Sequence, residues 1–592
     1  MNNSEIINTN LSFIKDELRI IQDKYNALLY STCGSLIANE KLFRAKLKTI
    51  NSNGTAVLIF RDDSPIPRMN SGEQHFIFLK KEDRSKDKCQ KIRYRDLLNL
   101  RVSKSVIKGK LIWQKVHKVP QEDNHQQEIK YREACFSLTE YTTESIQDLQ
   151  ARKFEGAIIY LGECEPLLDM LNNLLNYIRS YPGNPLFINQ QKAETPQVKP
   201  LINPEPNNII RLSELHRSFI IQGPPGTGKS YIIANLAKTL ALQNKSVLIT
   251  TLANKALIEI IKKDPLADLL KQGRLFKKAL DSQEESECRG IQNLKDVVPK
   301  IGEIHFSTYY SASGSPLLKH EGAAYDYVIV DEASQAVTAF LAATYSIGDK
   351  QIFVGDICQL PPVVQLDSDR IEKRNYHEAV YGLQKLSKLL PTYQLVNTYR
   401  LNPNSASYTR LFYALDLKAV NDNYHLFPLN ILNNQITFES GTYLLRVSSV
   451  SIINAISDIC CQLNDFKPTH DQRIKARIAV MTNRVKDVTH VFKKLNESLP
   501  SITDRFTVDT VHRCQGFTSD FAIYYVSESD IYSWKPEIFN VATSRAKIAT
   551  FIICSNYIKA INTIPFFINK LNQEGHILNF YDTINEELHN DK

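Results

Sequence analysis

The sequence predicts an α/β protein in which helices flank parallel sheets, preceded by a β-rich accessory segment. Three observations lead to this fold class. Beyond residue 208, apolar strands alternate with helical patterns, as in parallel sheets. Segment 219–230 is an apolar strand that runs into a glycine-rich loop and then a helix. Residues 40–160, in contrast, have the short strands and turns of a β domain.

Length and composition set the first limits. The chain has 592 residues, too many for one core, so we expect several domains. A net charge of +8 permits a nucleic-acid partner without requiring one. There is no run of 18 apolar residues and no signal-peptide pattern, so we expect no membrane partner. The ten cysteines lack Cys-x-x-Cys spacing, which argues against a zinc module and favours the cytoplasm, or the nucleus of a eukaryote.

Two helices are expected on either side of the β-rich segment. The first starts near Ser4 and runs to about Tyr30, with apolar residues at heptad spacing. The second, 166–179, has leucines and an isoleucine at the same spacing. The two helices either pair as an antiparallel stalk or pack separately into cores, and the pattern favours neither alternative.

The β-rich segment contains a predicted hairpin, in which strands 43–50 and 55–60 are joined by the turn 51–54. Segment 101–118 carries several lysines and an arginine, no acid, and one tryptophan. Basic strands with an aromatic residue can grip a nucleic-acid backbone, but a solvated barrel face has the same composition. The candidate contacts here are Lys108, Lys110 and Trp113.

The pattern Gly-x-x-x-x-Gly-Lys-Ser predicts a phosphate-binding loop for a nucleoside triphosphate, taken to be ATP. Its glycines allow the backbone N–H groups to face phosphate oxygens at a helix N-terminus. Lys229 would reach the β- and γ-phosphates, and Ser230 would bind Mg²⁺. The predicted loop residues are Gly223, Pro224, Pro225, Gly226, Thr227, Gly228, Lys229 and Ser230.

A second set of polar residues follows two later strands. The apolar strand 327–330 delivers Asp331 and Glu332 to the carboxyl edge of a sheet, where ligands bind. We expect Asp331 to hold Mg²⁺ and Glu332 to orient or deprotonate the attacking water. The strand that begins at residue 351 is followed by Gln359, which is placed to sense the γ-phosphate.

With these residues, the chain resembles the superfamily 1B helicases, in the branch of the nonsense-mediated-decay helicase and Sen1-like proteins. The matching motifs occur in the family's order: Asp331-Glu-Ala-Ser-Gln335, Gly355-Asp-x-x-Gln-Leu-Pro-Pro362, Tyr399-Arg-Leu-Asn-Pro403, Phe412-Tyr413, 506–516 and 540–547. The resemblance implies two RecA-like domains with ATP between them.

The resemblance also implies roles for residues of the second RecA-like domain. Arg400 and Arg545 would bring cations to the γ-phosphoryl group, where negative charge spreads during hydrolysis. Tyr399 would stack on adenine, unless it is a core tyrosine. The motif 506–516 adds Gln515 and Gly516 to the nucleotide site.

Nucleic-acid contacts are implied at the opposite edge of the sheets. Short hydroxyls and amides suit contacts with the sugar-phosphate backbone, although each of these residues alone is more often a loop-capping residue. The candidates are Thr251, Asn254, Thr308, Tyr309 and Thr510. The expected partner is single-stranded DNA or RNA, bound by a monomer.

The predicted domains follow from these patterns and the resemblance. They are a stalk helix (1–35), a β-barrel (36–160), a second stalk helix (161–182), a proline-containing linker (183–208), a first RecA-like domain (209–392, with a short insertion at 262–300) and a second RecA-like domain (393–592).

The sequence departs from the family pattern in three places. No glutamine lies between Gln197 and Gln222, so the usual adenine-reading glutamine is not evident. Thr518 stands where the family has a glutamate, which puts one nucleotide contact in doubt. The chain also lacks the Cys/His-rich module of the decay helicase.

The expected function is an ATP-driven motor that moves 5′ to 3′ on single strands. Two other functions remain open: an ATP-switched clamp or sensor without processive unwinding, and a scaffold that remodels protein partners. We find no nuclease motif beside the motor.

Overall fold

The computed structural model describes most of the chain. The described residues are 3–51, 54–61, 66–67, 74–79, 86–100, 107–121, 124–151, 158–185, 197–315, 324–422, 424–469, 474–499, 505–527, 530–555 and 564–580. The chain forms two compact units, Lys15–Leu168 and a second made of Met1–Ile14 with Asp169–Lys592. None of the described helices is long and apolar enough to cross a bilayer.

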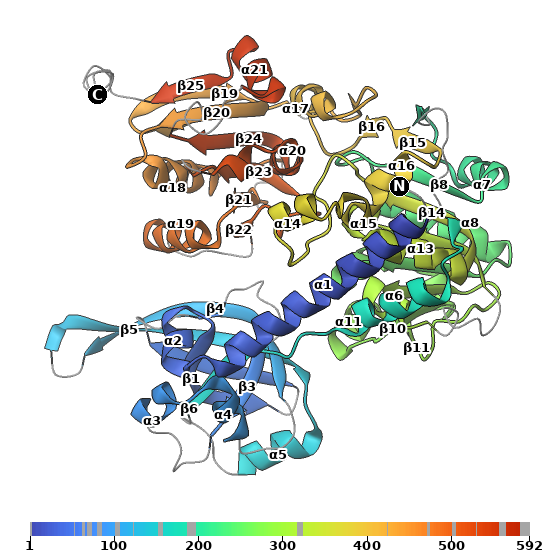
Figure 1. Ribbon diagram of the computed structural model, residues 1–592. Coiled ribbons are helices and arrows are strands. Elements are labelled where there is room, and N and C mark those ends of the chain that lie inside the picture. Colours follow the sequence, from blue (N-terminus) through green and yellow to red (C-terminus); the bar gives the residue numbers. More distant parts are fainter. Residues whose placement is uncertain are drawn as a thin grey trace. The chain divides into compact units, whose positions relative to one another are not determined.

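The unit Lys15–Leu168 is built on a closed antiparallel barrel with the strand order β1-β2-β5-β4-β3-β6 (Figure 1). The strands are β1 (Leu42–Asn51), β2 (Thr55–Arg61), β3 (Gln74–Phe78), β4 (Lys108–Gln121), β5 (Asn124–Glu140) and β6 (Ile158–Glu163). Short helices accompany them: α2 (Cys33–Ala38), α3 (Lys86–Lys91), α4 (Tyr94–Asn99) and α5 (Thr143–Ala151). The β1–β2 pair is the predicted hairpin, and alternating residues of both strands enter the barrel core.

The first RecA-like domain contains a nine-stranded sheet in the order β11-β10-β12-β9-β13-β14-β8-β15-β7, and every strand pair is parallel. Its strands are β7 (Val198–Leu201), β8 (Ser218–Gln222), β9 (Val247–Thr251), β10 (Leu275–Lys278), β11 (Gln292–Leu294), β12 (Ile304–Thr308), β13 (Tyr325–Val330), β14 (Gly348–Gly355) and β15 (Thr392–Leu395). Its helices are α6 (Asp169–Ser180), α7 (Pro206–Leu215), α8 (Lys229–Leu242), α9 (Asn254–Ile261), α10 (Ala267–Lys271), α11 (Ser282–Glu287), α12 (Tyr309–Ser313), α13 (Thr338–Ile347), α14 (Ser368–Lys373), α15 (His377–Val380) and α16 (Gly382–Ser387).

The second RecA-like domain contains a six-stranded parallel sheet in the order β22-β21-β23-β24-β20-β25. Its strands are β20 (Gly441–Val447), β21 (Ile478–Thr482), β22 (Phe506–Thr510), β23 (Ser519–Tyr525), β24 (Ala546–Cys554) and β25 (Ile577–Phe580). Two small pairs accompany it, β16 (Asn397–Thr398) with β17 (Lys418–Ala419), and β18 (Leu426–Ile431) with β19 (Asn434–Glu439).

Helices cover both faces of this second sheet. The helices are α17 (Pro403–Thr409), α18 (Ile452–Leu463), α19 (Val485–Ser498), α20 (Pro536–Thr543) and α21 (Phe566–Gln573). Side chains of α18 and α19 share one apolar cluster with the sheet, and side chains of α20 and α21 share another. The predicted α/β class, with tandem RecA-like domains and an accessory barrel, is confirmed.

The structure corrects the C-terminal part of the predicted linker 183–208. Strand β7 pairs with β15 as the edge strand of the first sheet, and α7 starts at Pro206. An edge strand tolerates Pro200 because its missing N–H is not needed by a neighbour. Pro206 suits the first turn of a helix, where the N–H would be unpaired anyway. The prolines therefore belong to the domain here.

The predicted insertion 262–300 also differs from expectation, because it is not simply helical. Strands β10 and β11 extend the parallel sheet beyond β12. Leu275 and Leu294 are buried, which explains why these short segments join the sheet despite their charged neighbours.

The two helices of the predicted stalk begin and end close to expectation. Helix α1 (Asn3–Tyr30) starts one residue before Ser4, and the boundary between the two units falls within it. Helix α6 starts at Asp169, whose carboxylate suits a helix N-terminus. Helix α6 packs on α12 and α13: Tyr310 donates to Asp169 at 2.6 Å, and Tyr177 lies 3.0 Å from the Ser346 hydroxyl.

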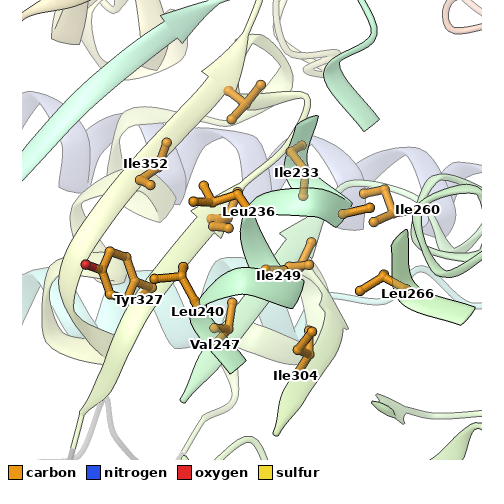
Figure 2. Close-up of a cluster of buried hydrophobic side chains, with 14 of the residues drawn as sticks. Ile233, Leu236, Leu240, Val247, Ile249, Ile260, Leu266, Ile304, Tyr327 and Ile352 are labelled. Carbon is orange, nitrogen blue, oxygen red and sulfur yellow. The ribbon is translucent and has the colours of Figure 1, made fainter. Parts of the chain in front are cut away.

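The first RecA-like domain has a core between α8 and its sheet (Figure 2). Ile233, Leu236 and Leu240 of α8 face Ile249 and Ile352 of the central strands. This packing fixes the direction of α8, and therefore the position of the loop at its N-terminus.

Replacing Ile249 with alanine should lower the stability of this domain by about 2–5 kcal/mol, because a fully buried side chain leaves a cavity. Differential scanning calorimetry of the chain should show the loss as a lower unfolding temperature. Leu242→Ala is the matched control: Leu242 ends α8 at 57% exposure, so its truncation should change stability by no more than about 0.5 kcal/mol. Equal shifts for the two variants would contradict this account of the core.

Candidate nucleotide site between the RecA-like domains

The predicted phosphate loop connects β8 to α8. Gly226 and Gly228 have φ angles of +73° and +80°, in the left-handed region that glycine adopts without strain. At Gly226 a side chain would also collide with Arg400 and Thr398. Glycine is therefore required at this position both by the backbone and by packing against the second domain.

The donors of this loop fit a triphosphate. Lys229 donates from Nζ to the carbonyl of Gly223 at 2.7 Å, so its side chain folds back along the loop. Helix α8 starts at Lys229, and the N–H groups of a first helical turn have no intrahelical acceptor. Together with the helix dipole and the half-buried Ser230 on the same turn, they form a suitable site for phosphate oxygens.

The acidic pair lies at the carboxyl end of β13, as predicted. Asp331 is 4% exposed and accepts a hydrogen bond at 2.9 Å from the N–H of Glu332. Burial raises the pKa of Asp331 to about 7; the Glu332 charge adds to the shift and Lys229 opposes it. Carboxylate and hydroxyl oxygens are ligands that Mg²⁺ prefers, so Asp331 and Ser230 fit this ion.

Glu332 has an unusual backbone for a glutamate, with φ at +52°. Non-glycine residues in the left-handed region cost about 1–3 kcal/mol and are concentrated at functional sites. The turn that follows is η5 (Ala333–Gln335), where the N–H of Gln335 donates to the Glu332 carbonyl at 2.8 Å. The backbone therefore leaves the regular path of β13 at Glu332.

Strand β15 pairs with β8 in the first sheet, so the second domain begins after Leu395 and not at residue 393 as predicted. The segment that follows β15 contacts the phosphate loop directly. The Thr398 hydroxyl donates to the carbonyl of Pro225 at 2.9 Å, and the N–H of Tyr399 donates to the carbonyl of Gly226 at 2.8 Å. The next residue, Arg400, is therefore held beside the loop. Two hydrogen bonds to the loop backbone thus position an arginine that sequence alone places far away.

Two guanidinium groups meet in this region. Arg400 donates to the carbonyl of Ser544 at 3.1 Å, and burial, followed by the charge of Arg545, lowers its pKa to about 9. Arg545 is 2% exposed and donates to the carbonyl of Val541 at 2.8 Å. Burial also lowers the pKa of Arg545, and the charge of Glu332 opposes this. Both arginines therefore lie within electrostatic reach of the catalytic candidate Glu332.

Gln359 is buried and belongs to a network that sequence reasoning missed. Its side-chain amide donates to Asp356 at 2.8 Å, and the side chains of Gln222 and Tyr413 donate to the same carboxylate. The sequence signal was present, since Gly355-Asp356 and Phe412-Tyr413 both belong to recognised motifs. The motifs alone did not reveal that these residues meet.

Tyr399 is 55% exposed, which excludes the alternative of a core tyrosine. Its ring lies next to Gly228, close to the phosphate loop. Gln515 and Gly516 follow β22, where Gly516 is exposed with φ at +79°. No described contact joins Gln515 or Gly516 to the phosphate loop, so their role at the nucleotide stays a prediction.

The nucleic-acid candidates of the two domains lie at strand ends. Thr251 of β9 and Thr308 of β12 are register partners, and Thr308 caps α12. Asn254 is the exposed first residue of α9, and Thr510 ends β22 opposite Thr482. These residues lie at the carboxyl edges of the sheets, which in the first domain also carry the phosphate loop after β8 and Asp331 after β13, so the expected placement at the opposite edge is wrong. A contact with a nucleic-acid strand stays a prediction.

The burial of Tyr309 does not fit its predicted role as a nucleic-acid contact. Tyr309 is 2% exposed, its ring packs on Phe340, and its hydroxyl donates to the Asp331 carbonyl at 2.5 Å. The aromatic ring prefers the apolar core under the sheet edge to the surface. Tyr309 therefore supports the metal-binding candidate Asp331 and does not present its ring to a strand.

In the barrel, Lys110 is exposed and Lys108 is half-buried, both on β4. The side chain of Trp113, and residues 101–106 of the basic segment, lie outside the described residues. The structure therefore leaves the proposed basic surface of the barrel as a prediction.

Comparisons with known proteins found similarity to ATP-dependent helicases. A family model described as an AAA domain matches residues 269–366. The chain is 31% identical over 156 residues to the Saccharomyces cerevisiae DNA replication ATP-dependent helicase/nuclease DNA2, covering 26% of this chain and 10% of that protein. The Gallus gallus protein of the same name is 26% identical over 395 residues, covering 62% and 38%.

A third relative is the Regulator of nonsense transcripts 1 homolog of Arabidopsis thaliana, 24% identical over 204 residues, covering 28% of this chain and 16% of that protein. Among solved structures, Arterivirus nonstructural protein 10 (helicase) matches at 13% identity with a TM-score of 0.35, covering 85% of this chain and 77% of that one. The chain spans less than two fifths of the length of each of the three curated relatives.

The raised pKa of Asp331 predicts a pH-dependent stability. Between about pH 4 and pH 7 the folded chain retains a proton that the unfolded chain releases, so the free energy of unfolding should fall as pH rises. Asp331→Asn cannot ionise and should flatten this fall. Unfolding temperatures measured from pH 5 to pH 8, without nucleotide or Mg²⁺, test the prediction.

Asp326→Asn, at the other end of β13, is the matched control. Burial there is outweighed by hydrogen bonds from Ser246 and Lys245, which lower the pKa of Asp326. Asp326 therefore stays ionised across the measured range, and its replacement should leave the slope unchanged. An unaltered slope in Asp331→Asn would show that this carboxyl is not protonated near neutral pH.

Proposed function

We propose that this chain, which belongs to the superfamily 1B helicases in the branch of the nonsense-mediated-decay helicase and Sen1-like proteins, hydrolyses ATP between its RecA-like domains and thereby moves 5′ to 3′ along single-stranded nucleic acid. The observation that carries the proposal is the pair of hydrogen bonds that Thr398 and Tyr399 donate to the backbone of the phosphate loop.

The first domain binds the triphosphate and its ion. The loop N–H groups and Lys229 hold the β- and γ-phosphates, and Ser230 and Asp331 hold Mg²⁺. Bound Mg²⁺ would neutralise phosphate charge, and its own charge would keep Asp331 ionised. Glu332 orients the attacking water and accepts its proton.

The second domain supplies the charge that stabilises hydrolysis. The negative charge that spreads over the γ-phosphoryl oxygens is met by the guanidinium groups of Arg400 and Arg545. Each arginine already donates to a backbone carbonyl, so its side chain is oriented before the reaction begins. Tyr399 covers the adenine on the exposed side.

Bound ATP then links the two RecA-like domains, because its phosphates interact with groups from both. Loss of the γ-phosphate removes the charge that Arg400 and Arg545 share with Lys229, so the domains can part. If the threonines at the strand ends of each domain hold a strand by its phosphates, alternate opening and closing moves the chain along it.

A clamp that closes on a strand without processive unwinding is the second candidate. It is favoured by the contacts between the domains, since Thr398 and Tyr399 donate to the phosphate loop and Asn540 donates to the carbonyl of Cys358. Such contacts can hold a closed state by themselves.

Lys229→Ala and Glu332→Gln should each reduce ATP turnover stimulated by single strands by at least about 10²-fold, because they remove charge stabilisation and proton transfer. A coupled phosphate-release assay with and without oligomers measures this. Lys238→Ala, on the same helix as Lys229, is the control and should remain active, because Lys238 forms an ion pair with the exposed Asp268 away from the phosphate loop. Turnover in the parent chain that is indifferent to single strands would contradict the motor.

A duplex with a single-stranded overhang separates motor from clamp and tests polarity. The motor should release the strand from a 5′-overhang substrate when ATP and Mg²⁺ are added, and much more slowly from a 3′-overhang substrate. Binding without release on both substrates would favour the clamp. The same assay with RNA and with DNA identifies the preferred nucleic acid.

A further inference from the structure

The carboxylate of Asp356 receives hydrogen bonds from both RecA-like domains. Within the first domain, Gln222 donates to Oδ1 at 2.7 Å and Gln359 donates to Oδ2 at 2.8 Å. From the second domain, the Tyr413 hydroxyl donates to the same Oδ2 at 2.7 Å. Asp356 is buried, so its charge depends on these donors. The side chain is therefore sensitive to whether the second domain is in place.

The network continues into the second domain through Asn540. The Asn540 side-chain amide donates to the Tyr413 hydroxyl at 2.8 Å and to the carbonyl of Cys358 at 2.9 Å. Asn540 is fully buried on α20, the helix that leads to Arg545. Tyr413 and Asn540 thus hold both the carboxylate and the backbone of the loop that carries Gln359.

We propose that Tyr413 and Asn540 are positioning residues that place Gln359 for the γ-phosphate only when the two domains are together. The inference rests on the proposed function and deepens it, because it names the residues through which domain closure would be coupled to recognition of the γ-phosphate. Tyr413 and Gln359 both donate to Oδ2 of Asp356. Removal of the Tyr413 hydroxyl therefore changes the surroundings of the oxygen that holds the Gln359 amide in place. Gln222, which leads directly into the phosphate loop, connects the same carboxylate to the rest of the site.

A purely structural role is the competing explanation, since buried hydrogen bonds also stabilise the contact between domains. The two explanations differ in what they predict for nucleotides. If the hydrogen bonds only stabilise the domain contact, their loss should change the affinities for ADP and ATP alike. If they position Gln359, their loss should change the affinity only for ligands with a γ-phosphate.

The test is Tyr413→Phe, with dissociation constants for ADP and for the non-hydrolysable imido analogue of ATP measured by titration calorimetry with Mg²⁺. We expect affinity for the analogue to weaken about tenfold, the effect of one hydrogen bond to a charged group, while affinity for ADP changes less than twofold. The kcat for ATP with single strands should fall by a similar factor. Asn540→Ala should act in the same direction, and the double variant should be no worse than the more severe single variant.

Tyr408→Phe is the matched control. Tyr408 is a buried tyrosine of the neighbouring helix α17, and its hydroxyl has no partner among the described residues. Its removal should leave both affinities unchanged.

Equal weakening of ADP and analogue in Tyr413→Phe, or no weakening of either, would overturn the inference while the proposed function stands. A lower unfolding temperature with an unchanged ratio of the two affinities would do the same. If the parent chain bound neither nucleotide, the proposed function would fail first.

Discussion

The hydrogen bonds from Thr398 and Tyr399 to the phosphate loop are the contact on which the site depends. They fix the register between two domains that also share apolar packing, since Leu360, which follows β14, lies in the buried cluster that α20 and α21 form on the second sheet. Because Arg400 follows directly in the chain, the backbone contact also decides where its charge lies. A few hydrogen bonds to main-chain carbonyls thus bring groups of both RecA-like domains to one candidate site.

The electrostatics of the seam follow from burial. Burial raises the pKa of Asp331 and lowers the pKa of Arg400 and Arg545, so each group is shifted toward its neutral form. A cation beside Asp331 and phosphate oxygens beside the arginines would reverse these shifts. Perturbed groups of opposite sign in one seam are typical of catalytic sites, which supports the proposed nucleotide site.

Sequence predicted the parts of the fold and site that depend on local patterns. The phosphate loop, the acids after β13 and the parallel sheets follow from residues that are close together in the chain. Sequence failed where burial or long-range pairing decided the outcome. Strand β7 contains a proline and is short, β10 and β11 have charged neighbours, and the ring of Tyr309 lies inward because the core accepts it. The meeting of Gln222, Asp356, Tyr413 and Asn540 joins four distant segments that no local pattern relates.

Gly226 shows how such a meeting restricts a single position. A glycine in this loop is usually explained by the ligand, because a side chain would crowd the phosphates. Here the obstacle is the protein itself, since a methyl group would push against Arg400 and Thr398. A larger residue at this position would hold the two RecA-like domains apart, even if the nucleotide pocket kept its shape. Tolerance at this position is thus governed by Arg400 and Thr398 and not by the ligand alone.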